Sequence, residues 1–336
     1  MSSIEIFVGP MSQNIVDATI EFHQDNPAVK IGFIPSRRQV ECDILGGGYV
    51  NNWTTKKFIE YVRNKSESVL VIRDHGGPLQ GELPDDGIMS LLTDVAAGFN
   101  IIHIDPWKKV RGVAEAAKVT ADLIKRCMVV DSTCEFEVGT EQAIRAYNEN
   151  ELRRFLEKLS DKLGEDFLNV KYAVVQSGTT VDGLVATGEF NATRSAAMVE
   201  ACNNFDLIPK EHNADYLLPS DIKARSDAGV VAFNLAPEFG VLETTCILSA
   251  MEDNMLYDIR DEFISICVES KKWKKWVKNL PKIPDEKTLA IICGHYVFSH
   301  PRFLKIKTAV SEVCEIDKIV QEAIRHRLWQ LTSISE

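Results

Sequence analysis

The sequence predicts an α/β protein, a (β/α)₈ TIM barrel with a helical C-terminal extension. Short apolar runs alternate with longer segments of helical period, which is typical of a parallel sheet covered by helices. Polar and charged residues follow the apolar runs, at the positions where barrels carry their catalytic groups. We therefore expect a single domain over residues 1–336, with the barrel at about 28–256 and the extension at about 257–336.

Seven apolar runs are expected to form barrel strands, because they are short and bounded by polar or turn-forming residues. In chain order they are Lys30 to Pro35, Ser68 to Ile72, Asn100 to Ile104, Cys134 to Val138, Val170 to Val175, Phe205 to Pro209 and Val230 to Asn234. A doubly wound sheet is the alternative, but no G-x-G-x-x-G fingerprint follows the first strand. Gly46-Gly47-Gly48 precedes a loop sequence, so we expect a flexible loop over the barrel mouth.

Helices are expected between these strands, and a further helix near the end of the chain. The segments are Thr54 to Asn64, Val113 to Lys125, Glu141 to Leu163, Ala192 to Asn203 and Leu242 to Met255. The segment from Glu141 has the clearest helical spacing of apolar residues. After about residue 256 the alternation ends. The amphipathic segment Ile316 to Leu331 is expected to cap the barrel, with pairing to a second subunit as the alternative.

Two polar segments stand out in the extension. Lys271 to Lys278 is strongly basic, and we expect a solvated helix face with two tryptophans docked on the body rather than a polyanion site. Gly294 to Arg302 follows the apolar run Leu289 to Cys293 and is expected to fold back toward the barrel mouth.

The composition limits the functions that the protein can have. The chain has 336 residues, 45% of them hydrophobic, which is enough for one large core. Its net charge of -11 argues against a nucleic-acid partner, which needs a basic surface. We expect no membrane segment and a cytoplasmic location, since no apolar stretch reaches about 18 residues and the start lacks a signal-peptide pattern. Eight cysteines without a C-x-x-C pair predict reduced thiols.

Polar groups gather at the predicted strand ends. Asp74 and His75 are the most informative pair, because a carboxylate can move a proton and an imidazole can bind a divalent metal. The other ends carry Ser36-Arg37-Arg38-Gln39, His103-x-Asp105, Glu135-x-Glu137, Gln176-Ser177-Gly178, Glu211-His212-x-x-Asp215 and Asn234. Together they predict a metal-assisted acid–base site on one rim. For any single residue, a solvent-facing loop position or a helix N-cap is the alternative.

These strand ends resemble those of known barrels. Asp74-His75-Gly76, His103-Ile104-Asp105 and Glu135-x-Glu137-Val138-Gly139 are similar to strand ends of the class II aldolases. Further stretches resemble the D-tagatose-1,6-bisphosphate aldolase subunit family, often called the non-catalytic or chaperone-like subunit. They are Gln39-Val40 with Gly47-Gly48-Tyr49, Asp74-His75-x-Gly77-Pro78, the helix after Asp105, Val138-Gly139-Thr140-Glu141, Val174-Val175-Gln176-x-Gly178 and His212-x-x-Asp215-Tyr216.

The resemblance implies a divalent metal bound by His75 and His212, with Glu137 as an additional or alternate ligand. Zn²⁺ is the expected cation, with Mn²⁺ and Mg²⁺ as alternatives. The resemblance makes Asp74 the base that moves a hydroxyl proton during carbon–carbon cleavage. Asp105 and Glu137 are expected to support the site by orienting the ligands or by binding the metal themselves.

Two features depart from the aldolase pattern. A third histidine is absent between Gln176 and Asp182, so Gln176, Asp182, Glu137 or no residue takes its place. The glycine-rich phosphate loop is also missing beside His212. A substrate phosphate would then depend on Arg37, Arg38, backbone amides or the segment from His295 to Arg302. The expected substrate-binding residues are Arg37, Arg38, Gln39, Gln176, Ser177 and Asn234.

These observations predict a metal-dependent aldolase or epimerase-type lyase, which acts on a ketose phosphate or related sugar acid by retro-aldol chemistry. One alternative is a non-catalytic partner subunit that stabilises a separate class II aldolase. Another is an isomerase that uses the same rim without carbon–carbon cleavage. The expected partners are a small sugar phosphate and either a second copy of the chain or an aldolase subunit, with no nucleic acid and no membrane.

Overall fold

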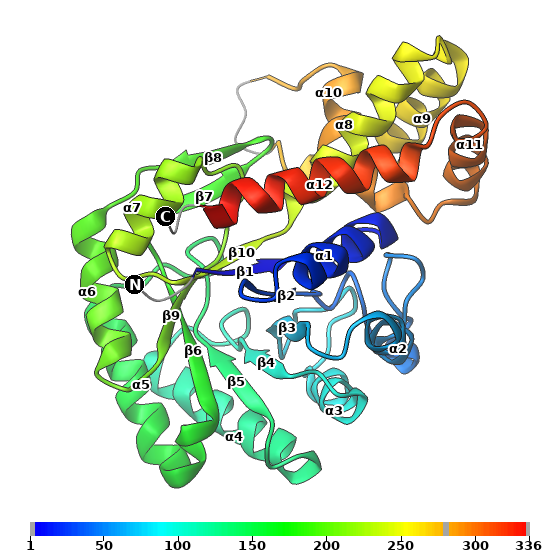
Figure 1. Cartoon of the computed structure of the whole chain (residues 1–336). Coiled ribbons are helices and arrows are strands. Elements are labelled where there is room, and N and C mark those ends of the chain that lie inside the picture. Colours follow the sequence, from blue (N-terminus) through cyan, green and yellow to red (C-terminus); the bar gives the residue numbers. More distant parts are fainter. Residues whose placement is uncertain (1–3, 278–281, 334–336) are drawn as a thin grey trace.

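The computed structural model describes residues 4–277 and 282–333. Within these residues, eight parallel strands close into a barrel in the order β1-β10-β9-β6-β5-β4-β3-β2, with helices around it (Figure 1). The strands are β1 (Glu5–Val8), β2 (Lys30–Phe33), β3 (Leu70–Gly76), β4 (Ile101–Ile104), β5 (Glu135–Val138), β6 (Val170–Val175), β9 (Ile208–Glu211) and β10 (Ala232–Leu235). The predicted TIM barrel is confirmed.

The barrel starts earlier than the predicted boundary at about residue 28. Strand β1 pairs in parallel with both β10 and β2, and so it closes the cylinder. Its residues Ile6, Phe7 and Val8 are fully buried. Strand β1 is only four residues long and precedes the first predicted strand. An apolar run this short does not stand out in the pattern from which the other strands are predicted. Glu5 is also buried, and its carboxylate accepts hydrogen bonds from Lys30 and Tyr172.

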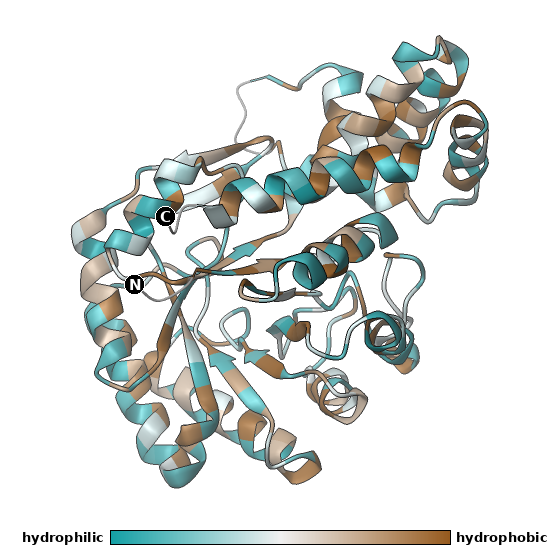
Figure 2. Ribbon diagram, in the orientation of Figure 1, coloured by the Kyte–Doolittle hydropathy of each residue, from teal (hydrophilic) through white to brown (hydrophobic). Residues whose placement is uncertain are grey.

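Helices follow the strands and cover the barrel. They are α1 (Gln13–Asp25), α2 (Thr55–Lys65), α3 (Ile88–Ala97), α4 (Val113–Val130), α5 (Glu149–Leu163), α6 (Ala192–Asn203), α7 (Pro219–Asp227) and α8 (Pro237–Asp253). Figure 2 shows hydrophobic and hydrophilic residues alternating along these helices, as expected for amphipathic segments with one buried face. A small antiparallel hairpin of β7 (Thr179–Asp182) and β8 (Val185–Gly188) stands between β6 and α6.

Helix α5 begins at Glu149, eight residues after the predicted start at Glu141. Asn148 caps it: its side chain accepts the Glu151 N–H, while the Glu151 carboxylate accepts the Asn148 N–H. This reciprocal pair satisfies amides that a helix end leaves free. Because the helix starts there, the residues from Glu141 to Tyr147 form a loop at the barrel mouth, and Glu141 and Ile144 line the mouth cavity.

The C-terminal extension consists of α9 (Tyr257–Glu269), η3 (Lys272–Lys275), α10 (Glu286–Cys293), η4 (Gly294–Val297), α11 (Pro301–Ser311) and α12 (Ile316–Thr332). We predicted that helix α12 caps an end of the barrel, and this prediction is wrong. The helix lies along the flank, against α1 and α8 (Figure 1). Its residues Ile316, Val320, Ile324, Leu328 and Leu331 are buried, so the chain itself covers this apolar face.

The basic run forms a short 3₁₀ turn and not the predicted helix, and Lys278 lies outside the described residues. The segment η4 does return to the mouth, where Tyr296 lines the cavity, as predicted. Over the described ranges, no helix is both long and apolar enough to cross a membrane. The eight cysteines are free thiols, and Cys246 and Cys314 are the two that are not fully buried.

Candidate active site

The carboxyl end of β3 bends so that two adjacent side chains reach the barrel mouth. The pairing of β3 with β4 shifts register between Arg73 and Gly76, and His75 has a left-handed φ of 47°. Neighbouring side chains on a regular strand point to opposite faces. The bulge removes this alternation, and Asp74 and His75 both line the mouth cavity. Backbone strain of this kind at a non-glycine residue is concentrated at functional sites.

His75 is oriented by a buried carboxylate. Its Nδ1 lies 2.7 Å from Asp105 Oδ2, and Thr140 Oγ1 donates to the same oxygen at 2.9 Å. The other oxygen of Asp105 accepts the Trp107 N–H at 3.0 Å. With Nδ1 held in this way, Nε2 of His75 faces Asp74, whose Oδ1 is 3.8 Å away. A carboxylate behind an imidazole is the usual support of a metal-binding histidine.

His212, which follows β9, is oriented in the same manner. Its Nε2 lies 2.6 Å from Glu137 Oε1, and Lys210 Nζ donates to Glu137 Oε2 at 2.6 Å. Burial alone would raise the pKa of Glu137, but the charges of Lys210 and the neighbouring imidazoles hold this pKa well below its usual range. The free Nδ1 of His212 is 3.9 Å from Asp74 Oδ1.

A third imidazole, that of His103 on β4, completes the cluster. Its ring centroid is 5.0 Å from that of His75 and 5.1 Å from that of His212. Its Nδ1 accepts the His75 backbone N–H at 3.1 Å, and its Nε2 donates to the Gly139 carbonyl oxygen at 3.1 Å. Burial lowers the pKa of His103 to about 4, so this ring is neutral at pH 7.

The three histidines can hold a metal ion, since one nitrogen from each lies within 4.8 Å of the others. His75 and His212 offer the nitrogens that face Asp74. His103 has both nitrogens engaged, and it must exchange one hydrogen bond to become a ligand. Asp74 Oδ1 lies near both free nitrogens and is an alternative oxygen donor.

The electrostatics of the cluster also fit a cation. Burial would lower the pKa of His75, but the carboxylates of Asp74, Asp105 and Glu141 raise it to about 10. The protein therefore stabilises a positive charge at this point, by a proton on His75 or by a metal ion in its place. Imidazole nitrogens with carboxylate support are a donor set that Zn²⁺ prefers.

His103 is the residue that the sequence-based ligand set lacked. That set consists of His75, His212 and Glu137, and the aldolase pattern places a third histidine near Gln176. The sequence feature that indicates His103 is the pattern His103-x-Asp105 at the end of β4. Glu137 has both oxygens engaged by His212 and Lys210. Asp182, the other suggested substitute, lies on the hairpin strand β7.

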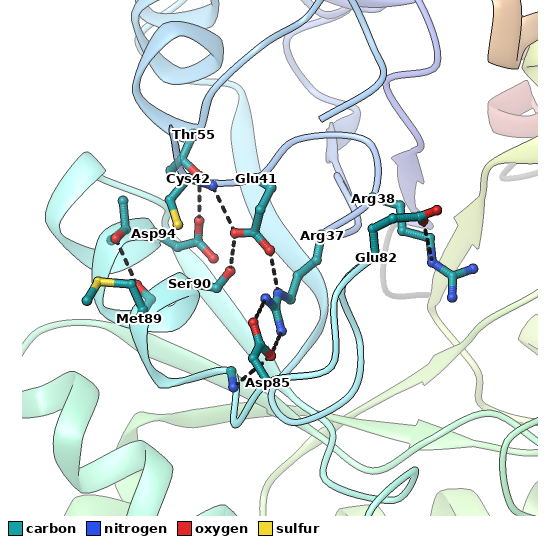
Figure 3. A network of polar contacts seen from close by, with 12 residues as sticks. Arg37, Arg38, Glu41, Cys42, Thr55, Glu82, Asp85, Met89, Ser90 and Asp94 are labelled. Carbon is teal, nitrogen blue, oxygen red and sulfur yellow. Dashed lines mark hydrogen bonds and ion pairs between the residues drawn. The ribbon is translucent and has the colours of Figure 1, made fainter. Parts of the chain in front are cut away.

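The proposed substrate-binding residues lie in different environments. Arg38 and Gln39 line the mouth cavity of about 280 Å³ together with Asp74 and His75. Arg37 is buried, and its guanidinium donates to Glu41 and Asp85 at 2.6 and 2.7 Å. Figure 3 shows Arg37 between these two carboxylates, while Arg38 points away from the network toward Glu82.

The other three predicted substrate-binding residues, Gln176, Ser177 and Asn234, already form hydrogen bonds within the protein. The Gln176 side chain donates to the carbonyl oxygens of Thr140 and Arg145, and so it anchors the loop before α5. Ser177 donates to the buried Glu211. Asn234 Nδ2 is 3.4 Å from Asp74 Oδ1, and its Oδ1 is buried without a partner among the described residues.

Neither a protein-family model nor a curated protein sequence matches the chain. Solved structures are similar in fold. A probable tagatose 6 phosphate kinase from Sinorhizobium meliloti has a TM-score of 0.79 at 16% identity, covering 98% of this chain and 100% of that chain. The fructuronate-tagaturonate epimerase of Cohnella laeviribosi has a TM-score of 0.64 at 10% identity, covering 98% and 81%.

The YdjI aldolase of Escherichia coli K12 has a TM-score of 0.59 at 12% identity, covering 99% of this chain and 93% of that chain. At such identities, similarity establishes the fold and not the activity. The chain therefore shares its fold with an aldolase and an epimerase of known structure, and the resemblance in its sequence implies the same fold.

Proposed function

We propose that the protein is a metal-dependent lyase or epimerase that acts on a ketose phosphate or related sugar acid by retro-aldol chemistry. The observation that supports this most directly is the cluster of His75, His103 and His212 beneath an open cavity, with the Asp74 carboxylate beside two free imidazole nitrogens. Zn²⁺ is the proposed cation, with Mn²⁺ and Mg²⁺ as alternatives.

The residues have distinct roles in this proposal. His75 and His212 hold the cation, with His103 or Asp74 as the third donor. When bound, the cation polarises substrate oxygens and stabilises the negative charge that develops as the carbon–carbon bond breaks. Asp105 and Glu137 act on the far nitrogens of His75 and His212, and thus fix the orientation of both rings.

Asp74 is the proposed base. Its carboxylate faces the cavity, and the bulge in β3 brings it to the same side as His75. It takes the proton of the substrate hydroxyl as the carbon–carbon bond breaks, and it returns a proton when the bond forms again. Transfer of a proton from Asp74 or solvent to the carbanion fragment, followed by release of both fragments, gives a lyase, while rotation of the aldehyde fragment before bond formation gives an epimerase.

The comparisons favour a second function, that of a non-catalytic partner of a separate aldolase. Among the three structures compared, the one named a probable tagatose 6 phosphate kinase has the TM-score of 0.79, whereas the YdjI aldolase and the epimerase have TM-scores of 0.59 and 0.64. The sequence also resembles subunits often called non-catalytic. The hydrogen bonds that occupy both nitrogens of His103 are in keeping with this role.

Two measurements separate the two functions. Purified protein is analysed for bound metal, and the metal-loaded protein is then screened for cleavage or C4 epimerisation of ketose phosphates and sugar acids. Turnover that is lost in His75→Ala supports the enzyme. Metal-loaded protein that is inert on all candidates, but raises the soluble yield of a co-expressed class II aldolase, supports the partner role. A protein that binds no added metal contradicts the enzyme outright.

A further inference from the structure

The position at which barrels commonly bind phosphate is already filled in this protein. That position is formed by the loops after the last two barrel strands and the N-terminus of a nearby helix. Here Asp215 Oδ1 accepts the N–H groups of Ala236 and Glu238, at the start of α8, at 2.8 and 2.9 Å. The Asp215 side chain therefore already occupies the amides that a substrate anion would need.

Three cations line the mouth cavity. Arg38 follows β2, Lys108 follows β4 and Lys275 ends η3, and all three line the cavity that contains Asp74 and His75. Among the described contacts, Lys108 and Lys275 form no side-chain hydrogen bond or ion pair. Arg38 has one distant ion pair, 3.8 Å from the exposed Glu82. We call Arg38, Lys108 and Lys275 the cationic rim.

The three charges of the cationic rim repel one another. Burial lowers the pKa of Lys108, and the charge of Arg38 lowers it further. Lys275 is an exposed residue, yet burial of its ammonium group and the charge of Arg38 lower its pKa to about 7. The carboxylates of Asp74 and Glu141 line the same cavity, and Asn213 donates to Glu141 at 2.6 Å. Like charges held together in this way favour an anionic ligand.

Aromatic rings hold Lys275 in place. Its Nζ lies 4.1 Å from the ring centroid of Trp276 and 5.2 Å from that of Tyr296. Such contacts favour a cation over the ring face. The basic run, expected to be a solvated face, thus directs one lysine into the mouth. A second cavity of about 360 Å³ continues outward from Arg38 and Lys275 along Lys271, Lys272 and Lys274.

We propose that the cationic rim of Arg38, Lys108 and Lys275 binds the phosphate group of a phosphorylated substrate, at the side of the mouth built by the C-terminal extension. The inference rests on the proposed function, because it names the substrate class of the same cavity. Phosphate is the favoured anion since a dianion matches a cluster of three cations better than a single carboxylate does. A sugar acid offers the same kind of contact through its carboxylate.

The test uses full-length protein at low ionic strength, with inorganic phosphate and D-glucuronate as separate probes in calorimetric titrations. We expect phosphate to bind the parent, and Lys275→Met and Arg38→Met each to weaken that binding by about tenfold. Lys275→Arg retains the charge and most of the affinity. Lys305→Met, on the exposed surface of α11, is the matched control for net charge and binds phosphate as the parent does.

The outcomes separate this inference from the proposed function. Titrations are made with zinc-loaded and with chelator-treated protein, and zinc binding is measured in every variant. Phosphate binding that persists without zinc and is lost in Lys275→Met supports the cationic rim, even if no activity is found. Any of three results would overturn the cationic rim as the binding site. They are equal phosphate binding in the parent and Lys275→Met, phosphate binding only when zinc is present, and no phosphate binding by the parent. Tighter binding of D-glucuronate than of phosphate would overturn the assignment to phosphate.

Discussion

At the scale of single residues, the chemistry depends on how carboxylates are paired. Asp74 Oδ1 faces the free nitrogens of His75 and His212, whereas Asp105 and Glu137 are fully engaged behind those rings. The sequence shows all three carboxylates at strand ends but not which of them is open to the cavity. The geometry makes Asp74 the one that can exchange a proton with a ligand.

Asp74→Asn tests this role because it keeps the shape of the side chain and removes its basicity. We expect turnover to fall by roughly 10²-fold or more, while zinc is still bound. The measurement is the turnover rate on whichever ketose phosphate or sugar acid the parent cleaves, beside the zinc content of both proteins. Equal rates in parent and variant would show that Asp74 moves no proton in the rate-determining step.

Lys210→Met addresses the buried pair beneath His212. Lys210 and Glu137 are both almost fully buried, so the variant leaves a carboxylate without its cation. Breaking such a pair costs about 3–5 kcal/mol. We expect urea unfolding to show a loss of this size. The double variant Lys210→Met/Glu137→Gln should recover part of it, and a double variant as unstable as Lys210→Met would contradict the explanation.

At the scale of elements, the sequence predicts the presence of most strands and helices but not all of their boundaries. The apolar runs that end at Ile72, Ile104 and Val138 coincide with β3, β4 and β5 to within a few residues, because burial on both faces leaves a continuous signal. The α5 boundary is less accurate, since Ile144 and Tyr147 extend the apolar pattern into a loop. The bulge in β3 could not be predicted, because register is set by pairing with β4.

The sequence places His103 at the predicted rim but not among the predicted metal ligands, for a related reason. A histidine within the apolar run Ile101 to Ile104 has the features of a core residue, and it is indeed fully buried. Its contact with His75 and His212 depends on the closure of the barrel, which brings β3, β4 and β9 around one axis. Distances across a barrel interior are not encoded in spacing along the chain.

The capping pair of α5 provides a prediction for an element. Asn148→Ala removes the side chain that accepts the Glu151 N–H. We expect the free energy of unfolding to fall by about 1 kcal/mol, as for other N-cap residues. Asn148→Asp keeps the acceptor and should retain stability, so chemical denaturation of the two variants tests the assignment. Equal losses in both would exclude the cap as the cause.

At the scale of the whole molecule, Glu243 links the end of the barrel sequence to its beginning. This residue of α8 is buried and accepts hydrogen bonds from Ser12 and Asn14 at the start of α1. Burial raises the pKa of Glu243 to about 7. An unfolded glutamate binds its proton more weakly, and the folded state therefore holds the extra proton between about pH 4.3 and pH 7.

Stability is expected to fall as pH rises through this interval, by an amount on the order of 3 kcal/mol. Glu243→Gln removes the ionisation, so the variant should lose this slope and be more stable than the parent at pH 8. The measurement is the free energy of unfolding from pH 5 to pH 8 at constant ionic strength. A slope that is the same in Glu243→Gln would show that another group causes it.

The carboxylate of Asp215 at the start of α8 has a stereochemical consequence. If the cationic rim binds the anionic end of the substrate, that end does not lie at the start of α8, where Asp215 occupies the amides. A carbon chain laid in the reverse direction, with its carbonyl oxygen kept toward the histidine cluster, would present the other prochiral face to Asp74. By occupying the amides at the start of α8, the Asp215 side chain would thereby select which of two epimeric sugars the barrel accepts.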